Sequence, residues 1–186
     1  MNIAILASGA GSNTANILLH FKNTSVNISL IACNNQEAGV FQIAKDHHID
    51  SILLTKENFK TSDVFVQELQ KRKIELVILA GFLWLAPKNL VSAFEGRIIN
   101  IHPALLPKFG GKGMYGHFVH EAVREAKEVE SGITIHLVNE EFDKGKILFQ
   151  AKASVENCSA SEIEQKVRAL EIEHFPKAIE NFISKM

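Results

Sequence analysis

Asn100 and His102 place two polar side chains, two residues apart, in the otherwise apolar stretch 98–103. Side chains at positions i and i+2 of a β-strand project from the same face, so this spacing predicts that the carboxamide and the imidazole lie side by side. Pro103 keeps His102 extended and ends the strand. A buried structural histidine is the alternative, but this pair suits general acid–base chemistry and hydrogen bonding to a developing oxyanion. We therefore expect both residues to be catalytic.

No nucleophile motif accompanies this pair. A Gly-x-Ser-x-Gly elbow is absent, and the two cysteines, Cys33 and Cys158, lie far apart and outside any recognised motif. Direct attack of one substrate on another is therefore favoured over a covalent intermediate on the enzyme. The isolated cysteines indicate reduced thiols of a cytoplasmic protein and do not support a metal site.

A second alternating segment, residues 131–138, places Thr134 and His136 on one face, which we expect to be polar and directed toward the site. The acidic turn at 139–145 follows, and by composition alone an ordinary solvated loop explains that turn equally well. Asp143 is singled out because a carboxylate that returns to His102 would orient the imidazole and favour its charged form.

A glycine-rich loop at residues 8–13 follows the first apolar strand and precedes a helical stretch. Backbone N–H groups in such a loop, together with the helix dipole, form a cradle for an anion. Thr14 occupies the third glycine position of a dinucleotide fingerprint, and the Gly-Lys-Ser/Thr of a P-loop is absent. A single phosphate ester therefore fits better than NAD, and a plain turn capped by Asn13 is the simpler alternative.

An alternating series of strands and helices is expected to position these residues. Apolar runs predict strands at 2–7, 27–33, 51–54, 76–79 and 98–102. Helical periodicity predicts helices between them, at 14–21, 39–47, 63–73 and 87–94. This alternation is typical of a parallel sheet whose functional loops lie at the C-terminal ends of the strands. We predict an α/β fold with a doubly wound, mostly parallel, Rossmann-like sheet and helices on both faces.

The second half of the chain follows a different pattern. After a glycine-rich loop at 110–116, the sequence predicts a helix at 117–126, strands at 132–138 and 147–153, and a helix at 159–185. We expect these strands to form an antiparallel C-terminal region, and Pro176 predicts a kink or a break in the last helix. Residues 1–186 are expected to form one domain, with a phosphate-binding half at 1–102 and a catalytic half at 103–186.

Composition narrows the classes of function. A chain of 186 residues is long enough for one domain with a sizeable core. Its 20 Lys and Arg against 21 Asp and Glu give a net charge of -1, which leaves no basic surface for nucleic acid. The apolar N-terminal run stops at Ser8, too early for a signal sequence or a membrane span. Neither nucleic acid nor a membrane is therefore an expected partner.

These motifs together resemble the folate-dependent formyltransferase family, and within it the branch that formylates glycinamide ribonucleotide in purine biosynthesis. The resemblance spans nearly the whole chain and rests on residues 8–13, 80–82, 100–108, 131–136 and 143–145. It implies a transferase that moves the formyl group of 10-formyltetrahydrofolate, a co-substrate, to the amine of 5-phosphoribosylglycinamide without a metal. The resemblance implies that both substrates are small molecules, and we expect a monomer or a homodimer.

The resemblance also implies roles for individual residues. Asn100 and His102 would stabilise the tetrahedral intermediate, with His102 as proton donor and Asp143 tuning it. The ribonucleotide would be held by the first loop and the last helix, through Gly11, Ser12, Asn13, Thr14, Ala15 and Glu171. The folate would be bound by Leu83, Trp84, Leu85, Ala86, Asn100, Asn139, Glu140, Glu141, Phe142 and Asp143.

Three features depart from the family pattern. Trp84 stands where a basic residue near the folate tail is expected, and Ser62 stands where an arginine can reach a substrate anion. The segment 109–116 is longer and richer in glycine than is typical. We hypothesise that it is a mobile lid in which Lys112 supplies positive charge, and a plain surface loop is the alternative.

Other functions stay open at this point. A methionyl-tRNA formyltransferase is expected to carry a further C-terminal domain and a basic surface, and a formyltetrahydrofolate hydrolase an N-terminal regulatory domain; we expect neither here. A non-catalytic nucleotide-binding module would explain the loop at 8–13 but would leave Asn100, His102 and Asp143 without a role.

Overall fold

The computed structural model describes residues 1–186 and divides into two compact units, Met1–Ile99 (unit 1) and Asn100–Met186 (unit 2). The division falls inside strand β5 (Ile98–His102), close to the predicted boundary after residue 102. Asn100 and His102 therefore belong to unit 2. That the whole chain acts as one domain stays a prediction.

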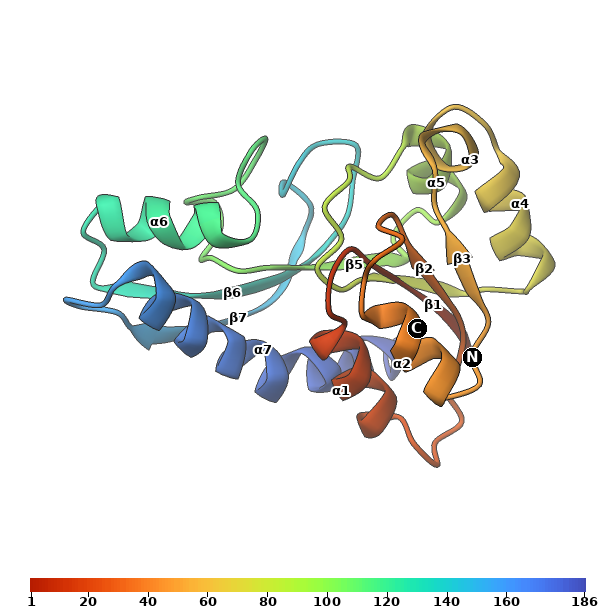
Figure 1. Cartoon of the computed structure of the whole chain (residues 1–186), viewed down its shortest axis with the longest axis horizontal. Helices are drawn as coiled ribbons and strands as arrows, with labels where there is room; N and C mark the ends of the chain where they lie inside the picture. Colours follow the sequence, from red (N-terminus) through yellow and green to blue (C-terminus); the bar gives the residue numbers. More distant parts are fainter. The chain divides into compact units, whose positions relative to one another are not determined.

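Four parallel strands form the centre of unit 1 (Figure 1). Their order is β3-β2-β1-β4, and each neighbouring pair is parallel. They comprise β1 (Asn2–Ala7), β2 (Asn27–Cys33), β3 (Ser51–Leu53) and β4 (Leu76–Leu79). Every residue of β4 is buried, as are Ile3 and Ile5 of β1. Strands with apolar side chains on both faces need a helical layer on each face to exclude water.

Helices supply those two layers in unit 1. Figure 1 shows α1 and α2 on one face of the strands and α3, α4 and α5 on the other. Their bounds are α1 (Ser12–His20), α2 (Val40–Asp46), α3 (Lys56–Lys60), α4 (Val64–Lys71) and α5 (Lys88–Ala93). On the first face, Val40 and Ala44 of α2 pack with Ile31 and Cys33 of β2 in one buried cluster.

The short helix α3 is the one helix that the sequence pattern does not predict. Thr55 caps it, because its Oγ1 accepts a hydrogen bond from the Asn58 N–H at 3.2 Å and its own N–H donates to Asn58 Oδ1 at 2.8 Å. This is a capping box with Asn in place of the usual Glu or Gln. The customary sequence signal is therefore missing.

Helix α1 begins at Ser12, earlier than the predicted start at residue 14, and its N-cap is Gly11. The alternative interpretation, a turn capped by Asn13, is wrong in its capping residue. Gly11 has φ 84°, and a Cβ there would lie 2.7 Å from Ile43 Cδ1. Only glycine combines this left-handed backbone with so close an approach to the side chains of α2.

Unit 2 contains an antiparallel strand pair and two helices. Strands β6 (Glu130–Leu137) and β7 (Ile147–Ser154) pair antiparallel, with a register shift at Ile135/His136, and β5 precedes them in the strand order. Helix α6 (His117–Glu125) leads into β6, and α7 (Ala160–Ile183) packs on α6, β6 and β7. Parallel strands between helices in unit 1 and antiparallel strands in unit 2 confirm the predicted fold class.

Helix α7 runs through Pro176 without a break, so of the predicted kink or break the break is wrong. Proline removes one internal hydrogen bond of a helix, a cost that tertiary packing can offset. Here Phe175, Pro176 and Ile179 are all buried. The apolar contacts of this turn hold the helix together where propensity alone predicts its end. No helix of the structure combines the length and the apolar character needed to cross a membrane.

Candidate active site

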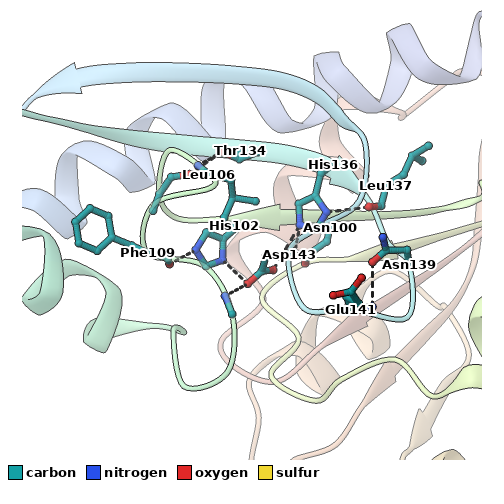
Figure 2. Close-up of polar contacts among 12 residues, drawn as sticks. Asn100, His102, Leu106, Phe109, Thr134, His136, Leu137, Asn139, Glu141 and Asp143 are labelled. Atoms are coloured by element: carbon teal, nitrogen blue, oxygen red, sulfur yellow. Dashed lines mark hydrogen bonds and ion pairs between the residues drawn. The ribbon is translucent and has the colours of Figure 1, made fainter.

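Four polar side chains of unit 2 lie together where β5, β6 and the turn after β6 meet (Figure 2). Asn100 and His102 come from β5, His136 from β6, and Asp143 from the acidic turn. His102 and His136 are 3% and 2% exposed. The structure thus brings together the pair predicted on β5, the carboxylate expected to return to it, and the predicted polar face of β6.

His102 is held between a backbone carbonyl and a carboxylate. Its Nε2 lies 2.7 Å from the carbonyl oxygen of Phe109, and its Nδ1 lies 3.6 Å from Asp143 Oδ2. A carbonyl oxygen can only accept, so Nε2 carries the hydrogen in this bond. In the neutral imidazole, Nδ1 then presents its lone pair to Asp143.

Burial dominates the acid–base behaviour of His102. It lowers the pKa of the imidazole below its ordinary 6.5, although the charge of Asp143 and the Phe109 carbonyl both raise it; His136 lowers it further. Asp143 does favour the charged form, as expected, but burial has the larger effect on the pKa of His102. The free energy lost when the imidazolium is removed from water is larger here than the free energy gained from its attraction to one carboxylate.

Asn100 and His136 fix each other's orientation. The Nδ1 of His136 lies 2.9 Å from the carbonyl oxygen of Leu137, so that nitrogen carries the proton and donates it. The His136 Nε2 is then an acceptor, and the carboxamide N–H of Asn100 donates to it at 3.1 Å. These two hydrogen bonds determine that the N–H end of the Asn100 carboxamide, and not its oxygen, faces β6.

Asp143 is the carboxylate that faces both imidazoles. Its Oδ2 accepts a hydrogen bond from the Gly111 N–H at 2.9 Å, and its Oδ1 lies 3.6 Å from His136 Nε2. Burial alone would raise the pKa of Asp143, but His136, His102 and the Gly111 N–H together lower it below its ordinary value. The group is therefore an anion at neutral pH, held in a left-handed backbone conformation with φ 54°.

Thr134 holds the chain that follows His102. Its Oγ1 donates to the Ala104 carbonyl at 2.7 Å and accepts from the Leu106 N–H at 2.9 Å, with no exposed surface. Gln150 of β7 donates to the same Oγ1 at 2.8 Å and to the Leu106 carbonyl at 3.0 Å. Sequence reasoning misses Gln150, because a polar residue on a half-exposed strand carries no signal for this role.

The predicted phosphate loop lies at the start of α1 in unit 1. Ser12 is exposed, whereas Asn13 and Thr14 are 8% and 0% exposed. The Ser8 Oγ accepts from the Leu83 N–H at 2.9 Å, and the Ser8 N–H donates to the Gly81 carbonyl at 3.1 Å. The loop is therefore fixed to the segment after β4. The first turn of α1 contains no acidic side chain to repel an anion.

The segment 83–86, predicted to line the folate slot, presents an exposed Leu83 and a half-buried Trp84. Trp84 contacts Phe59 in a tilted arrangement and Phe82 edge to face, with ring centroids 5.9 and 6.3 Å apart. The Nζ of Lys60 lies 4.9 Å from the centroid of its ring. A lysine of α3 therefore places a positive charge over the Trp84 ring.

The other predicted contact residues lie in unit 2. In the acidic turn, the Asn139 Oδ1 accepts from the Glu141 N–H at 3.0 Å, and Phe142 is 39% exposed. Glu171 is half-buried on α7, and Lys112 is exposed in the glycine-rich segment. That these residues contact folate or ribonucleotide, and that Lys112 belongs to a lid, stay predictions. No group of three or more His, Cys, Asp or Glu side chains is arranged to hold a metal ion.

The chain matches the family described as Formyl transferase over residues 1–179. It is 33% identical over 187 residues to the phosphoribosylglycinamide formyltransferase of Bacillus subtilis (strain 168), covering 97% of this chain and 93% of that protein. It is 43% identical over 160 residues to the chloroplastic phosphoribosylglycinamide formyltransferase of Arabidopsis thaliana, covering 82% of this chain. The chain spans 55% and 59% of the length of that protein and of its Vigna unguiculata counterpart.

Solved structures of similar proteins agree with the fold. The phosphoribosylglycinamide formyltransferase of Bacillus halodurans has a TM-score of 0.90 and 31% sequence identity, covering 100% of this chain and 96% of that one. The phosphoribosylglycinamide formyltransferase of Anaplasma phagocytophilum has a TM-score of 0.87 and 31% identity, covering 96% and 84%. The predicted family resemblance is therefore confirmed.

Proposed function

Because the chain belongs to the formyl transferase family, we propose that it transfers the formyl group of 10-formyltetrahydrofolate to the amine of 5-phosphoribosylglycinamide. The products are the formylglycinamide ribonucleotide and tetrahydrofolate, in purine biosynthesis. The observation that carries this proposal is the cluster of Asn100, buried His102 and Asp143, which has the donors and the fixed charge that acyl transfer between two nitrogens needs.

The reaction begins when the amine nitrogen of the ribonucleotide attacks the formyl carbon. A new C–N bond forms, the carbonyl oxygen becomes an oxyanion, and the bond to the folate nitrogen then breaks. The attacking nitrogen loses one proton and the departing folate nitrogen gains one. Asn100 supplies a carboxamide donor to the oxyanion, and His102 supplies the positive charge of its imidazolium form beside it.

The low pKa of His102 suits this sequence of events. The free enzyme holds a neutral imidazole, because burial disfavours the cation. When negative charge develops on the formyl oxygen beside it, the charged form becomes more favourable. Asp143, an anion on the other side of the ring, stabilises the imidazolium at the same moment. His102 thus takes up the proton that the attacking nitrogen loses as the intermediate forms, and the departing folate nitrogen receives a proton when the intermediate collapses.

We assign the binding roles to the first loop, the last helix and the segments 83–86 and 139–143. The N-terminus of α1, with Gly11, Ser12 and Asn13, holds the phosphate of the ribonucleotide through backbone N–H groups and the helix dipole. Thr14 and Ala15 continue this turn, and Glu171 contacts the glycinamide. The folate lies against residues 83–86 and 139–143, where exposed Leu83 and Phe142 offer apolar surface.

The compartment and the oligomeric state belong to the same proposal. Cys33 and Cys158 are both free thiols, as a reducing compartment requires, which supports a cytoplasmic enzyme. A monomer or a homodimer is expected, and size-exclusion chromatography with light scattering distinguishes the two.

The direct test follows tetrahydrofolate formation from 10-formyltetrahydrofolate by ultraviolet absorbance in three tubes. One contains the ribonucleotide, one contains only water, and one contains the dephosphorylated riboside. We expect product with the ribonucleotide alone. Product in water would identify a hydrolase instead, and ligand binding without product in any tube would identify a non-catalytic binding module.

A further inference from the structure

Three consecutive residues bring their backbone against His102 and Asp143. The carbonyl oxygen of Phe109 accepts the Nε2–H of His102 at 2.7 Å, and the N–H of Gly111 donates to Asp143 Oδ2 at 2.9 Å. That same oxygen faces His102 Nδ1 at 3.6 Å. Residues 109–111 therefore contact both members of the pair through main-chain atoms alone, as Figure 2 shows for Phe109.

Both flanking contacts depend on an unusual backbone at this point. Phe109 has φ 55°, in the left-handed region that side chains with a Cβ rarely adopt. A Cβ on Gly110 would lie 2.5 Å from Leu106 Cδ2 and 3.3 Å from Asp143 Cβ. The chain therefore turns at Phe109 and passes Asp143 closely at Gly110, which directs the carbonyl and the N–H to opposite sides of the His102–Asp143 contact.

We infer that residues 109–111 form a backbone clip that positions His102 for the reaction, with the Phe109 carbonyl selecting the Nε2–H tautomer. The clip assigns each ring nitrogen a role. Nε2 carries the proton, and Nδ1 is kept as the unprotonated nitrogen beside Asp143, ready to be protonated when the oxyanion forms. An imidazole free to rotate would present either nitrogen in either state and would lose this order.

This inference rests on the proposed function for its catalytic consequence, but the tautomer is measurable without turnover. Nitrogen-15 NMR of histidine-labelled protein reports which ring nitrogen of His102 carries the proton, and His102→Gln identifies the signal. We expect Nε2–H in the free enzyme. A predominant Nδ1–H tautomer would overturn the clip even if the enzyme transfers formyl groups as proposed.

Variants at Phe109 separate the backbone from the ring. Phe109→Val puts a β-branched residue where the left-handed conformation is hardest to reach, so the carbonyl should turn away. We expect kcat to fall by about tenfold or more with a smaller change in KM, together with a mixed tautomer at His102. Phe109→Gly removes the same ring, but glycine adopts the left-handed backbone readily. This variant should therefore keep most of the wild-type kcat and the Nε2–H tautomer.

Lys73→Val is the matched control. Lys73 also has a positive φ, 54°, and it follows α4 in unit 1, whereas the His102–Asp143 contact belongs to unit 2. Its replacement carries the same backbone penalty, so it should destabilise the fold without changing kcat or the tautomer. Gly110→Ala offers a second route, because its Cβ would lie 2.5 Å from Leu106 Cδ2 and 3.3 Å from Asp143 Cβ, so kcat should fall here too, with a mixed tautomer at His102. Equal losses of rate in folded Phe109→Val and Phe109→Gly would assign the effect to the ring and reject the clip.

Discussion

His102 and Asp143 face each other across 3.6 Å, a distance slightly longer than a hydrogen bond, with the Nδ1 lone pair of the neutral ring directed at a carboxylate oxygen. This contact is poor for the neutral imidazole and good for the imidazolium. Burial nevertheless keeps the ring neutral in the free enzyme. The negative charge of Asp143 therefore has no positive partner in the free enzyme, and it attracts His102 once the imidazole takes up a proton during the reaction.

Removing either donor should slow the chemical step. His102→Ala and Asn100→Ala each remove a group that contacts the developing oxyanion, and loss of one such donor costs roughly 3–4 kcal/mol of barrier. We expect kcat to fall on the order of a hundredfold or more while circular dichroism stays unchanged. His47→Ala, at an exposed histidine of unit 1, is the control. Near-normal turnover in both variants would show that the chemistry lies elsewhere.

Asp143→Asn should move the pH dependence. The carboxylate raises the pKa of His102 against the stronger effect of burial, so its removal lowers that pKa further. The acid limb of the kcat/KM profile, which reports protonation of the free enzyme, should therefore shift to lower pH, and the plateau should fall. A lower plateau with an unmoved acid limb would mean that Asp143 does not act through the charge of His102.

The fold could be predicted from the sequence wherever the spacing of apolar residues matches the pattern of buried side chains. The strands of unit 1 are short apolar runs between turn residues, and they are found close to where the pattern predicts them. Helix α3 was not predicted, because Asn58 replaces the usual Glu or Gln of a capping box. The break predicted at Pro176 failed because tertiary packing of a buried turn outweighs local propensity.

The site could be predicted only in part, for a physical reason. The spacing of Asn100 and His102 on one strand is visible in the sequence, because side-chain direction alternates along a strand. The contact with Phe109 is not, since it uses a backbone carbonyl that every residue type possesses. The charge state of His102 could not be predicted either, because burial lowers its pKa and Asp143 raises it, and only the folded structure sets the relative size of these two effects.

Thr134→Val should test the support beneath the site. The Thr134 hydroxyl satisfies the N–H of Leu106 and takes part in a buried network with Gln150. Valine keeps the shape of threonine but leaves those donors unpaired, which costs about 1–3 kcal/mol of unfolding free energy. Urea denaturation measures this loss, and Thr61→Val, at an exposed threonine of unit 1, provides the comparison. Equal stability of Thr134→Val and wild type would contradict the network.

Substitutions in the first loop should separate binding from chemistry. The proposed phosphate site uses the α1 N-terminus, so Ser12→Ala and Asn13→Ala remove polar groups beside the phosphate and spare the reacting centre. We expect the KM for the ribonucleotide to rise by about tenfold, with kcat and the KM for folate little changed.

The dephosphorylated riboside, added as a competing ligand, is the internal control, because a ligand without the phosphate makes no contact that these variants could remove. Its inhibition constant should therefore be the same for wild type and variants. If the variants weakened folate binding, or weakened riboside binding as much as ribonucleotide binding, the loop would not be the phosphate site.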